Sequence, residues 1–228
     1  LVDANGDDLP DLAVGRLPAR TSYEAARIIG KIVAYETSGD SNRSAMLVSD
    51  VDDISDFSTT TADIRALLPS DYLVNEVSRS ATTDAQARNL VQSGANGGPG
   101  LVNFVGHGSI DTWRGNLLNS ADALSLRNEG RLSLYVSGNC LNGYFQDPYL
   151  ESLGESLLKS YNGAVAVWAS SGATGPEGQR VLLDAFYREL FSGQSVTIGE
   201  AAARAKSAAA GDVRRSWVLL GDPATKLH

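Results

Sequence analysis

Cys140 and His107 are the two residues of this sequence whose types and placement could support nucleophilic chemistry. Cys140 is the only cysteine, and the only other histidine, His228, is the last residue. A thiol becomes a strong nucleophile once it ionises, and a nearby imidazole promotes that ionisation. The imidazole can also donate a proton to a leaving amine. The pair therefore indicates covalent catalysis by cysteine, provided that the fold brings the two side chains together.

Each of these residues follows a predicted strand. The apolar run 101–105 (LVNFV) ends two residues before His107, and the run 132–137 (LSLYVS) ends three residues before Cys140. His107 and Cys140 are 33 positions apart in the sequence, a spacing that suits one strand–helix–strand unit. Ligands of parallel α/β sheets bind beyond the carboxyl ends of the strands. If the two strands are neighbours, the imidazole and the thiol face the same crevice.

The glycines on both sides of His107 would let a substrate backbone approach closely. The backbone amides of Gly108 and Cys140 could stabilise an oxyanion that forms during the reaction. The alternative is structural, because a lone cysteine is often a small buried apolar residue. A histidine in a glycine-rich turn is often structural as well. Residue types and spacing alone leave both interpretations open.

Apolar runs alternate with helical patterns along the chain. Strands are predicted at 11–15, 45–49, 72–77, 101–105, 132–137, 164–169 and 217–221. Helices are predicted at 21–38, 60–68, 83–94, 120–127, 151–161, 178–191 and 197–209. This alternation predicts an α/β fold with a mainly parallel sheet.

Composition narrows the classes of function. The 228 residues carry a net charge of −8, and 43% of them are hydrophobic, as in an ordinary globular protein. The acidic balance and the lack of a basic stripe argue against nucleic acid as a partner. The longest apolar run is strand-sized, so no membrane span is expected.

An Asp-rich loop at the start of the chain has the alternating oxygen ligands that Ca²⁺ prefers. The sequence DANGDDLPD (3–11) supplies the expected ligands, which are the side chains of Asp3, Asn5, Asp7 and Asp11 and the carbonyl of Leu9. The alternative is a polar turn whose side chains bind its own backbone. Calcium is therefore expected only as a structural ion, and no cofactor is expected for catalysis.

Several segments together resemble the gingipain family of cysteine peptidases, which shares its fold with caspases. LVNFVGHGSIDTW (101–113) resembles the family's histidine motif, and SGNCLNGYF (137–145) resembles its cysteine motif. Segments 11–36, 163–171 and 217–227 resemble other parts of the family in the same order. The resemblance implies a three-layer α/β/α sandwich of the caspase-like type with a mostly parallel central sheet.

The resemblance also implies a mechanism, in which peptide bonds are hydrolysed through a thioester on Cys140. His107 would protonate the leaving amine, and the amides of Gly108 and Cys140 would form the oxyanion hole. A carboxylate that follows the strand at 45–49 would orient the imidazole. Asp52 is the first choice for that carboxylate and Asp53 the second.

The family's best-known members cut after Arg or Lys by means of an acidic residue, and Asp56 falls near the matching place. Val105, Gly138 and Ser171 are the other residues expected to line the substrate site. Two departures from the family's pattern weaken the expectation of cleavage after Arg or Lys. The loop that carries Asp56 is shorter, and the segment 171–177 (SGATGPE) stands where those relatives have a tryptophan.

Residues 1–20 are expected to form the Asp-rich loop and a first strand, and residues 21–228 the caspase-like catalytic domain. The expected partners are peptide or protein substrates and a companion domain or pro-domain. A secreted or cell-surface location is expected. Two alternatives stay open: a transpeptidase that uses the same thioester, and a non-catalytic, calcium-stabilised adhesion module.

Overall fold

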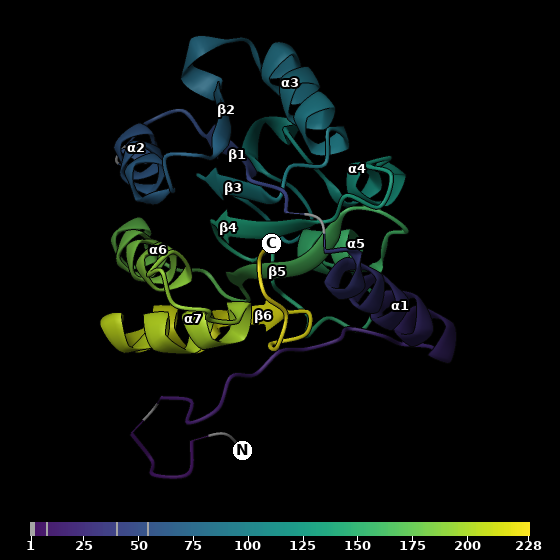
Figure 1. The fold of residues 1–228 in the computed structure, drawn as a ribbon. Helices are drawn as coiled ribbons and strands as arrows, with labels where there is room; N and C mark the ends of the chain where they lie inside the picture. Colours follow the sequence, from purple (N-terminus) through teal and green to yellow (C-terminus); the bar gives the residue numbers. More distant parts are fainter. Residues whose placement is uncertain (1–2, 8, 40, 54) are drawn as a thin grey trace.

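The computed structural model describes residues 3–7, 9–39, 41–53 and 55–228. Its centre is a six-stranded sheet in the order β2-β1-β3-β4-β5-β6 (Figure 1). The strands are β1 (Ser44–Ser49), β2 (Leu73–Ser78), β3 (Leu101–Val105), β4 (Ser133–Gly138), β5 (Ala164–Ser170) and β6 (Trp217–Leu220). Neighbouring strands from β2 to β5 run parallel, and β6 runs antiparallel to β5.

Helices cover both faces of the sheet. The helices are α1 (Ser22–Ser38), α2 (Phe57–Leu67), α3 (Asp84–Asn96), α4 (Ser120–Ser125), α5 (Leu153–Lys159), α6 (Pro176–Leu190), α7 (Ile198–Ala205) and α8 (Gly211–Ser216). The short 3₁₀ turns are η1 (Arg79–Ala81), η2 (Arg114–Asn116) and η3 (Lys206–Ala208). Helices α2, α6 and α7 group on one side, and α1, α3, α4 and α5 on the other (Figure 1). The predicted three-layer α/β sandwich with a mostly parallel sheet is confirmed.

The inner strands read as continuous apolar runs because both of their faces are covered. Every residue of β3, β4 and β5 is buried, whereas the edge strand β2 is largely exposed. This burial explains why apolar runs in the sequence predict the inner strands well. No helix among the described residues is long and apolar enough to cross a membrane.

The predicted strand at 11–15 is wrong. These residues belong to no strand, and the segment meets the sheet only through an isolated bridge between Arg16 and Leu220. Leu12 and Val14 are exposed, so the apolar residues that suggested a strand do not pack into the core. The N-terminal segment runs outward from the body of the domain (Figure 1).

Candidate active site

The register between β3 and β4 brings His107 and Cys140 to equivalent places. Val105 is paired with Gly138, and the Gly106 N–H donates to the Gly138 carbonyl at 3.1 Å. His107 and Cys140 each lie two residues beyond the Val105–Gly138 pair. The two side chains therefore belong to adjacent loops at the carboxyl edge of the sheet, as the spacing predicts.

His107 contacts a carboxylate from the loop after β1. Its Nε2 lies 2.9 Å from Asp53 Oδ2, and its ring meets the edge of Phe57 at a centroid distance of 5.2 Å. The hydrogen bond from His107 is the main cause that lowers the pKa of Asp53, followed among the lowering causes by those from Ser55 and Arg114. An ionised carboxylate only accepts hydrogen bonds, so the imidazole carries its proton on Nε2. The other ring nitrogen, Nδ1, is then left for the thiol or the substrate.

Asp52, the first choice for this carboxylate, lies elsewhere. Its Oδ1 accepts the Ser58 N–H at 2.9 Å and its Oδ2 accepts the Ser58 hydroxyl at 2.6 Å. Ser58 is in the first turn of α2, where backbone N–H groups lack helical partners. Asp52 thus stabilises the start of α2, and Asp53, the second choice, is the carboxylate beside His107.

Asp50 also binds the main chain of His107, a role that was not predicted from the sequence. This fully buried residue directly follows β1. Its Oδ2 accepts the backbone N–H of His107 at 3.1 Å, and its Oδ1 accepts from Arg79 Nη1 at 2.7 Å. A Cβ at Gly106 would lie 2.4 Å from the Cβ of Asp50, so the glycine is required by this packing. An aspartate that ends a buried strand beside two others was the available signal.

Cys140 is partly buried in a segment with a constrained backbone. Its Sγ lies 3.5 Å from the Thr174 carbonyl and 3.9 Å from Gln179 Nε2. The next residue, Leu141, has a positive φ of 67°, and its N–H donates to the Gly172 carbonyl at 3.2 Å. The loop after β5 and the start of α6 therefore form the wall behind the thiol.

Side-chain amides tie the cysteine loop to the histidine loop. Asn139 Nδ2 donates to Asn142 Oδ1 at 2.7 Å, and Asn142 Nδ2 donates to the Ser109 carbonyl at 2.7 Å. Both asparagines are fully buried. A Cβ at Gly108 would lie 1.9 Å from Asn139 Nδ2, so only glycine fits where the two loops meet.

Gly108, whose amide is one of the expected oxyanion donors, lies in a short bridge with Trp113. Gly108 and Trp113 form an antiparallel bridge, flanked by hydrogen bonds from Arg114 N to the His107 carbonyl and from Ser109 N to the Thr112 carbonyl. In such a pair the amide of the bridged residue points away from its partner. The Gly108 N–H is therefore directed away from Trp113.

A cavity of about 320 Å³ opens beside this arrangement, between α2 and α6. Val105 and Phe57 line it, and Gln179, which contacts the Cys140 sulfur, forms part of its wall. Asp56 and Val105 were both expected to line the substrate site. Gly138 and Ser171 were also expected there but are not among the residues that line this cavity. The Ser171 hydroxyl instead donates to the Ser216 carbonyl at 2.7 Å.

The cavity carries more negative than positive charge. Asp56 caps α2 by accepting the Thr59 N–H at 2.7 Å, and this bond is the main cause that lowers the pKa of Asp56. Asp63 and Glu177 line opposite sides, and among the described residues of the lining Arg180 is the one cation. Its guanidinium lies 3.0 Å from Glu177 Oε1 and 4.0 Å from Asp63 Oδ2. Arg180 therefore bridges the two helices across the cavity.

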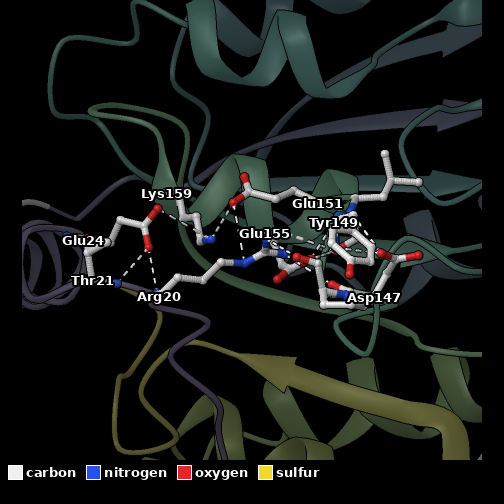
Figure 2. Close-up of polar contacts among 11 residues, drawn as sticks. Arg20, Thr21, Glu24, Asp147, Tyr149, Glu151, Glu155 and Lys159 are labelled. Carbon is white, nitrogen blue, oxygen red and sulfur yellow. Dashed lines mark hydrogen bonds and ion pairs between the residues drawn. The ribbon is translucent and has the colours of Figure 1, made fainter.

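A polar network on another part of the surface fastens the loop between Cys140 and α5 (Figure 2). Arg20 donates to the carbonyls of Asp147 and Pro148 at 3.2 and 2.8 Å. The buried Lys159 lies 2.6 Å from Glu151 and 3.7 Å from Glu24. The start of α1 and the end of α5 thus hold the segment that leads away from the cysteine.

The side chains of the N-terminal Asp-rich loop bind its own backbone. Asp3 Oδ1 accepts the Gly6 N–H at 2.7 Å, Asp7 Oδ1 accepts the Leu9 N–H at 2.9 Å, and Asp11 Oδ2 accepts the Ala4 N–H at 2.6 Å. The Asn5 amide nitrogen lies 3.3 Å from Asp7 Oδ2 and 3.4 Å from Asp11 Oδ1, so these side chains converge. Within the described ranges, no group of three or more His, Cys, Asp or Glu residues is placed to hold a metal. Calcium binding stays a prediction.

A cysteine and a histidine on adjacent strand ends of a caspase-like sheet are the arrangement of a cysteine peptidase. The chain belongs to peptidase family C25, which it matches over residues 1–228. The expected gingipain-type family is therefore confirmed. No curated protein sequence matches the chain significantly.

Solved structures agree with the fold. The Arg-specific cysteine proteinase gingipain R superposes with a TM-score of 0.86 at 19% identity, over 98% of this chain and 57% of that one. The complex of Porphyromonas gingivalis RgpB pro- and mature domains gives a TM-score of 0.86 at 19% identity, over 99% and 59%. The Saccharomyces cerevisiae separase–securin complex gives 0.63 at 12% identity, over 92% and 14%. This chain thus spans 57% to 59% of the length of the gingipain structures.

Proposed function

We propose that the chain is the catalytic part of a cysteine endopeptidase. The observation that carries the proposal is the common position of Cys140 and His107 beyond the paired ends of β3 and β4. The Cys140 thiol gives its proton to His107 Nδ1, the sulfur attacks the scissile carbonyl, and a C–S bond forms. The C–N bond then breaks as His107 gives its proton to the amine nitrogen. Water resolves the thioester, and its proton returns through His107.

The backbone amides of Gly108 and Cys140 stabilise the oxyanion in this mechanism. They stabilise the transition state more than the substrate because the negative charge develops only during the reaction. Asp53 keeps the imidazole in the required tautomer by accepting its Nε2 proton. Asp50 accepts the backbone N–H of His107 and so fixes the position of the histidine main chain beside the carboxyl edge of the sheet.

The substrates in this proposal are peptides with Arg or Lys before the cut. The support is the cavity beside Cys140, which contains the carboxylates of Asp56, Asp63 and Glu177 against one guanidinium. Gingipain R is described as Arg-specific, and its likeness favours the same preference here. A carboxylate can accept two parallel hydrogen bonds from a guanidinium, and such a bidentate contact is stronger than a single bond.

We further propose a secreted or cell-surface location and an association with a pro-domain. The RgpB structure contains such a pro-domain together with its mature domain. Calcium in the N-terminal loop belongs to the same proposal, since free calcium is plentiful outside cells. The support is the sequence pattern, in which the side chains of Asp3, Asn5, Asp7 and Asp11 and the Leu9 carbonyl are the expected ligands.

A peptide-library cleavage profile of the active protein tests the proposed function, with Cys140→Ala as control. Cleavage after basic residues that disappears in Cys140→Ala is expected. Mass spectrometry of products formed with and without an added amine separates hydrolysis from transpeptidation, because an amine adduct appears only in the second case. Cleavage that survives in Cys140→Ala contradicts the mechanism. A purified protein that cleaves no library peptide favours the adhesion module.

A further inference from the structure

Arg114 contacts the surroundings of His107 at three points. Its backbone N–H donates to the His107 carbonyl at 2.9 Å. Its Nη1 donates to Asp53 Oδ2 at 3.1 Å, and this is the same oxygen that His107 Nε2 contacts at 2.9 Å. The same Nη1 lies 3.9 Å from Asp50 Oδ2, which accepts the His107 N–H. One side chain thus reaches both carboxylates that hold this histidine.

The backbone of Arg114 is fixed by its neighbours. Trp113 is fully buried and stacks on Phe104 at a centroid distance of 4.4 Å. Gly115 has a positive φ of 77°, and a Cβ there would lie 2.5 Å from Arg79 Nε. Because both neighbours are constrained, Arg114 presents its guanidinium to Asp53 from a defined direction. Its side chain is 46% exposed, so a substitution removes little packing.

We propose that Arg114 is a positioning residue for His107, which holds the Asp53 carboxylate on the imidazole and offsets part of its negative charge. The inference rests on the proposed function, in which His107 is the general acid. A carboxylate shared with a guanidinium stabilises an imidazolium less than a free carboxylate does. The imidazolium therefore releases its proton to the leaving amine more readily while its orientation is kept.

The charges around His107 determine whether loss of the Arg114 charge favours or disfavours protonation of the imidazole. Asp53 and Asp50 approach from the loop after β1, and Arg114 approaches from η2. Arg79 of η1 binds Asp50 and also Asp84 at the start of α3. Phe57 of α2 contributes an apolar edge, and the Cys140 thiol lies on the neighbouring loop. Removal of the Arg114 charge leaves this balance more negative, which favours the protonated ring.

The direct test is a histidine titration by NMR in Arg114→Gln and in the wild type. The chain has only two histidines, so a His228→Gln background leaves the His107 ring signal alone. The midpoint of that signal is expected to rise by about half a pH unit in Arg114→Gln. Arg114→Lys keeps the charge and should titrate close to the wild type. Arg188→Gln removes an exposed guanidinium that pairs with Asp184 on α6, and is the matched control for net charge.

Turnover gives the second readout. Arg114→Gln is expected to lower kcat about tenfold with little change in KM, since the substrate cavity is not lined by Arg114. A His107 midpoint that is unchanged in Arg114→Gln, or that moves equally in Arg188→Gln, overturns the inference. The NMR titration needs no turnover. It therefore still decides the role of Arg114 if the wild type proves to have no peptidase activity and the proposed function fails.

Discussion

His107 Nε2 lies 2.9 Å from Asp53 Oδ2, although 54 residues separate the two in the chain. The strand order explains the contact, because β3 lies between β1 and β4. The loop after β1 carries Asp53, the loop after β3 carries His107, and the loop after β4 carries Cys140. The histidine therefore sits in the middle loop, between a carboxylate on one side and a thiol on the other.

Asp52 and Asp53 are adjacent in the chain, but only Asp53 should affect catalysis. Asp53→Asn is expected to lower kcat about a hundredfold, because the neutral amide no longer stabilises the imidazolium and can turn its NH2 group to the ring, which favours the wrong tautomer. Asp52→Asn is the matched control and should leave kcat unchanged. It should cost less than about 1 kcal/mol of unfolding free energy, since the asparagine Oδ1 can still accept the Ser58 N–H and only the charge and one oxygen are lost. Kinetics and urea unfolding of both variants check this, and equal effects on kcat would show that the assignment to Asp53 is wrong.

Substrate preference should respond to the charges of the cavity. Arg180→Gln removes the guanidinium that lies between Glu177 and Asp63. We expect kcat/KM for peptides with Arg before the cut, relative to Leu, to rise about threefold, because the substrate guanidinium no longer competes with a resident one. Asp63→Asn should lower the same ratio. Arg188→Gln, on the same helix, should leave it unchanged.

The same measurement tests whether the protein prefers to cut after Arg or Lys at all. Peptides that differ only in the residue before the cut give the ratio directly. If the wild type cuts after Leu as well as after Arg, the cavity does not select for positive charge. Asp56 is then a helix cap alone, which its bonds to Thr59 already make it.

Calcium should stabilise the N-terminal loop if the side chains of Asp3, Asn5, Asp7 and Asp11 bind the ion. At a hundredfold excess over the Kd, an ion that binds only the folded state adds about 2.7 kcal/mol. Thermal unfolding in EDTA and after addition of Ca²⁺ measures this, with Asp7→Ala as the variant that should lose the response. Coincident thermal unfolding curves for the wild type under both conditions would show that the loop is a polar turn that binds no calcium. Catalysis should change little, because the loop contributes no group near Cys140.

Lys31 makes stability depend on pH. Its Nζ donates to the carbonyls of Asn162 and Ala164, and burial, with Arg27 nearby, lowers the pKa of Lys31 to about 7. An unfolded lysine titrates near 10.4. The unfolded chain therefore binds more protons between these two values, and the free energy of unfolding rises with pH across that window.

The test compares Lys31→Met with the wild type in urea. The variant should be more stable than the wild type at pH 7, and this advantage should shrink by about 2 kcal/mol by pH 9. Lys226→Met, which alters an exposed lysine, is the control and should show no such trend. A constant difference between Lys31→Met and the wild type across this range would mean that Lys31 stays charged in the fold.

The sequence predicts most of this sheet because buried parallel strands are apolar on both faces. That is also why His107 and Cys140 could be placed at neighbouring strand ends. The short run 11–15 also contains three apolar residues, yet it lies outside the sheet, because apolar character alone does not say what a segment packs against. Helix ends were less predictable. The helix expected at 151–161 forms only over Leu153–Lys159, after the Ser152 cap.

The carboxylates of the site show a different limit. Asp50, Asp52 and Asp53 are close in sequence and chemically alike, yet Asp50 accepts the His107 backbone N–H, Asp53 contacts the His107 ring, and Asp52 binds Ser58. The backbone torsions within this loop decide which of the three carboxylates reaches the His107 ring. Arg79 and Arg114 were not predicted, since they come from short 3₁₀ turns whose positions depend on tertiary packing. Residue types therefore predict the dyad, but not the ionic support around it.

Trapping of the acyl-enzyme tests the central claim most directly. The protein is mixed with a peptide substrate, quenched in acid within its first turnover, and digested for tandem mass spectrometry. The account predicts an added mass equal to the acyl half of the substrate, located on Cys140 and sensitive to hydroxylamine as a thioester is. His107→Ala should accumulate that adduct much more slowly. Turnover of the substrate with no adduct on Cys140, or with the same adduct on another residue, would contradict the account.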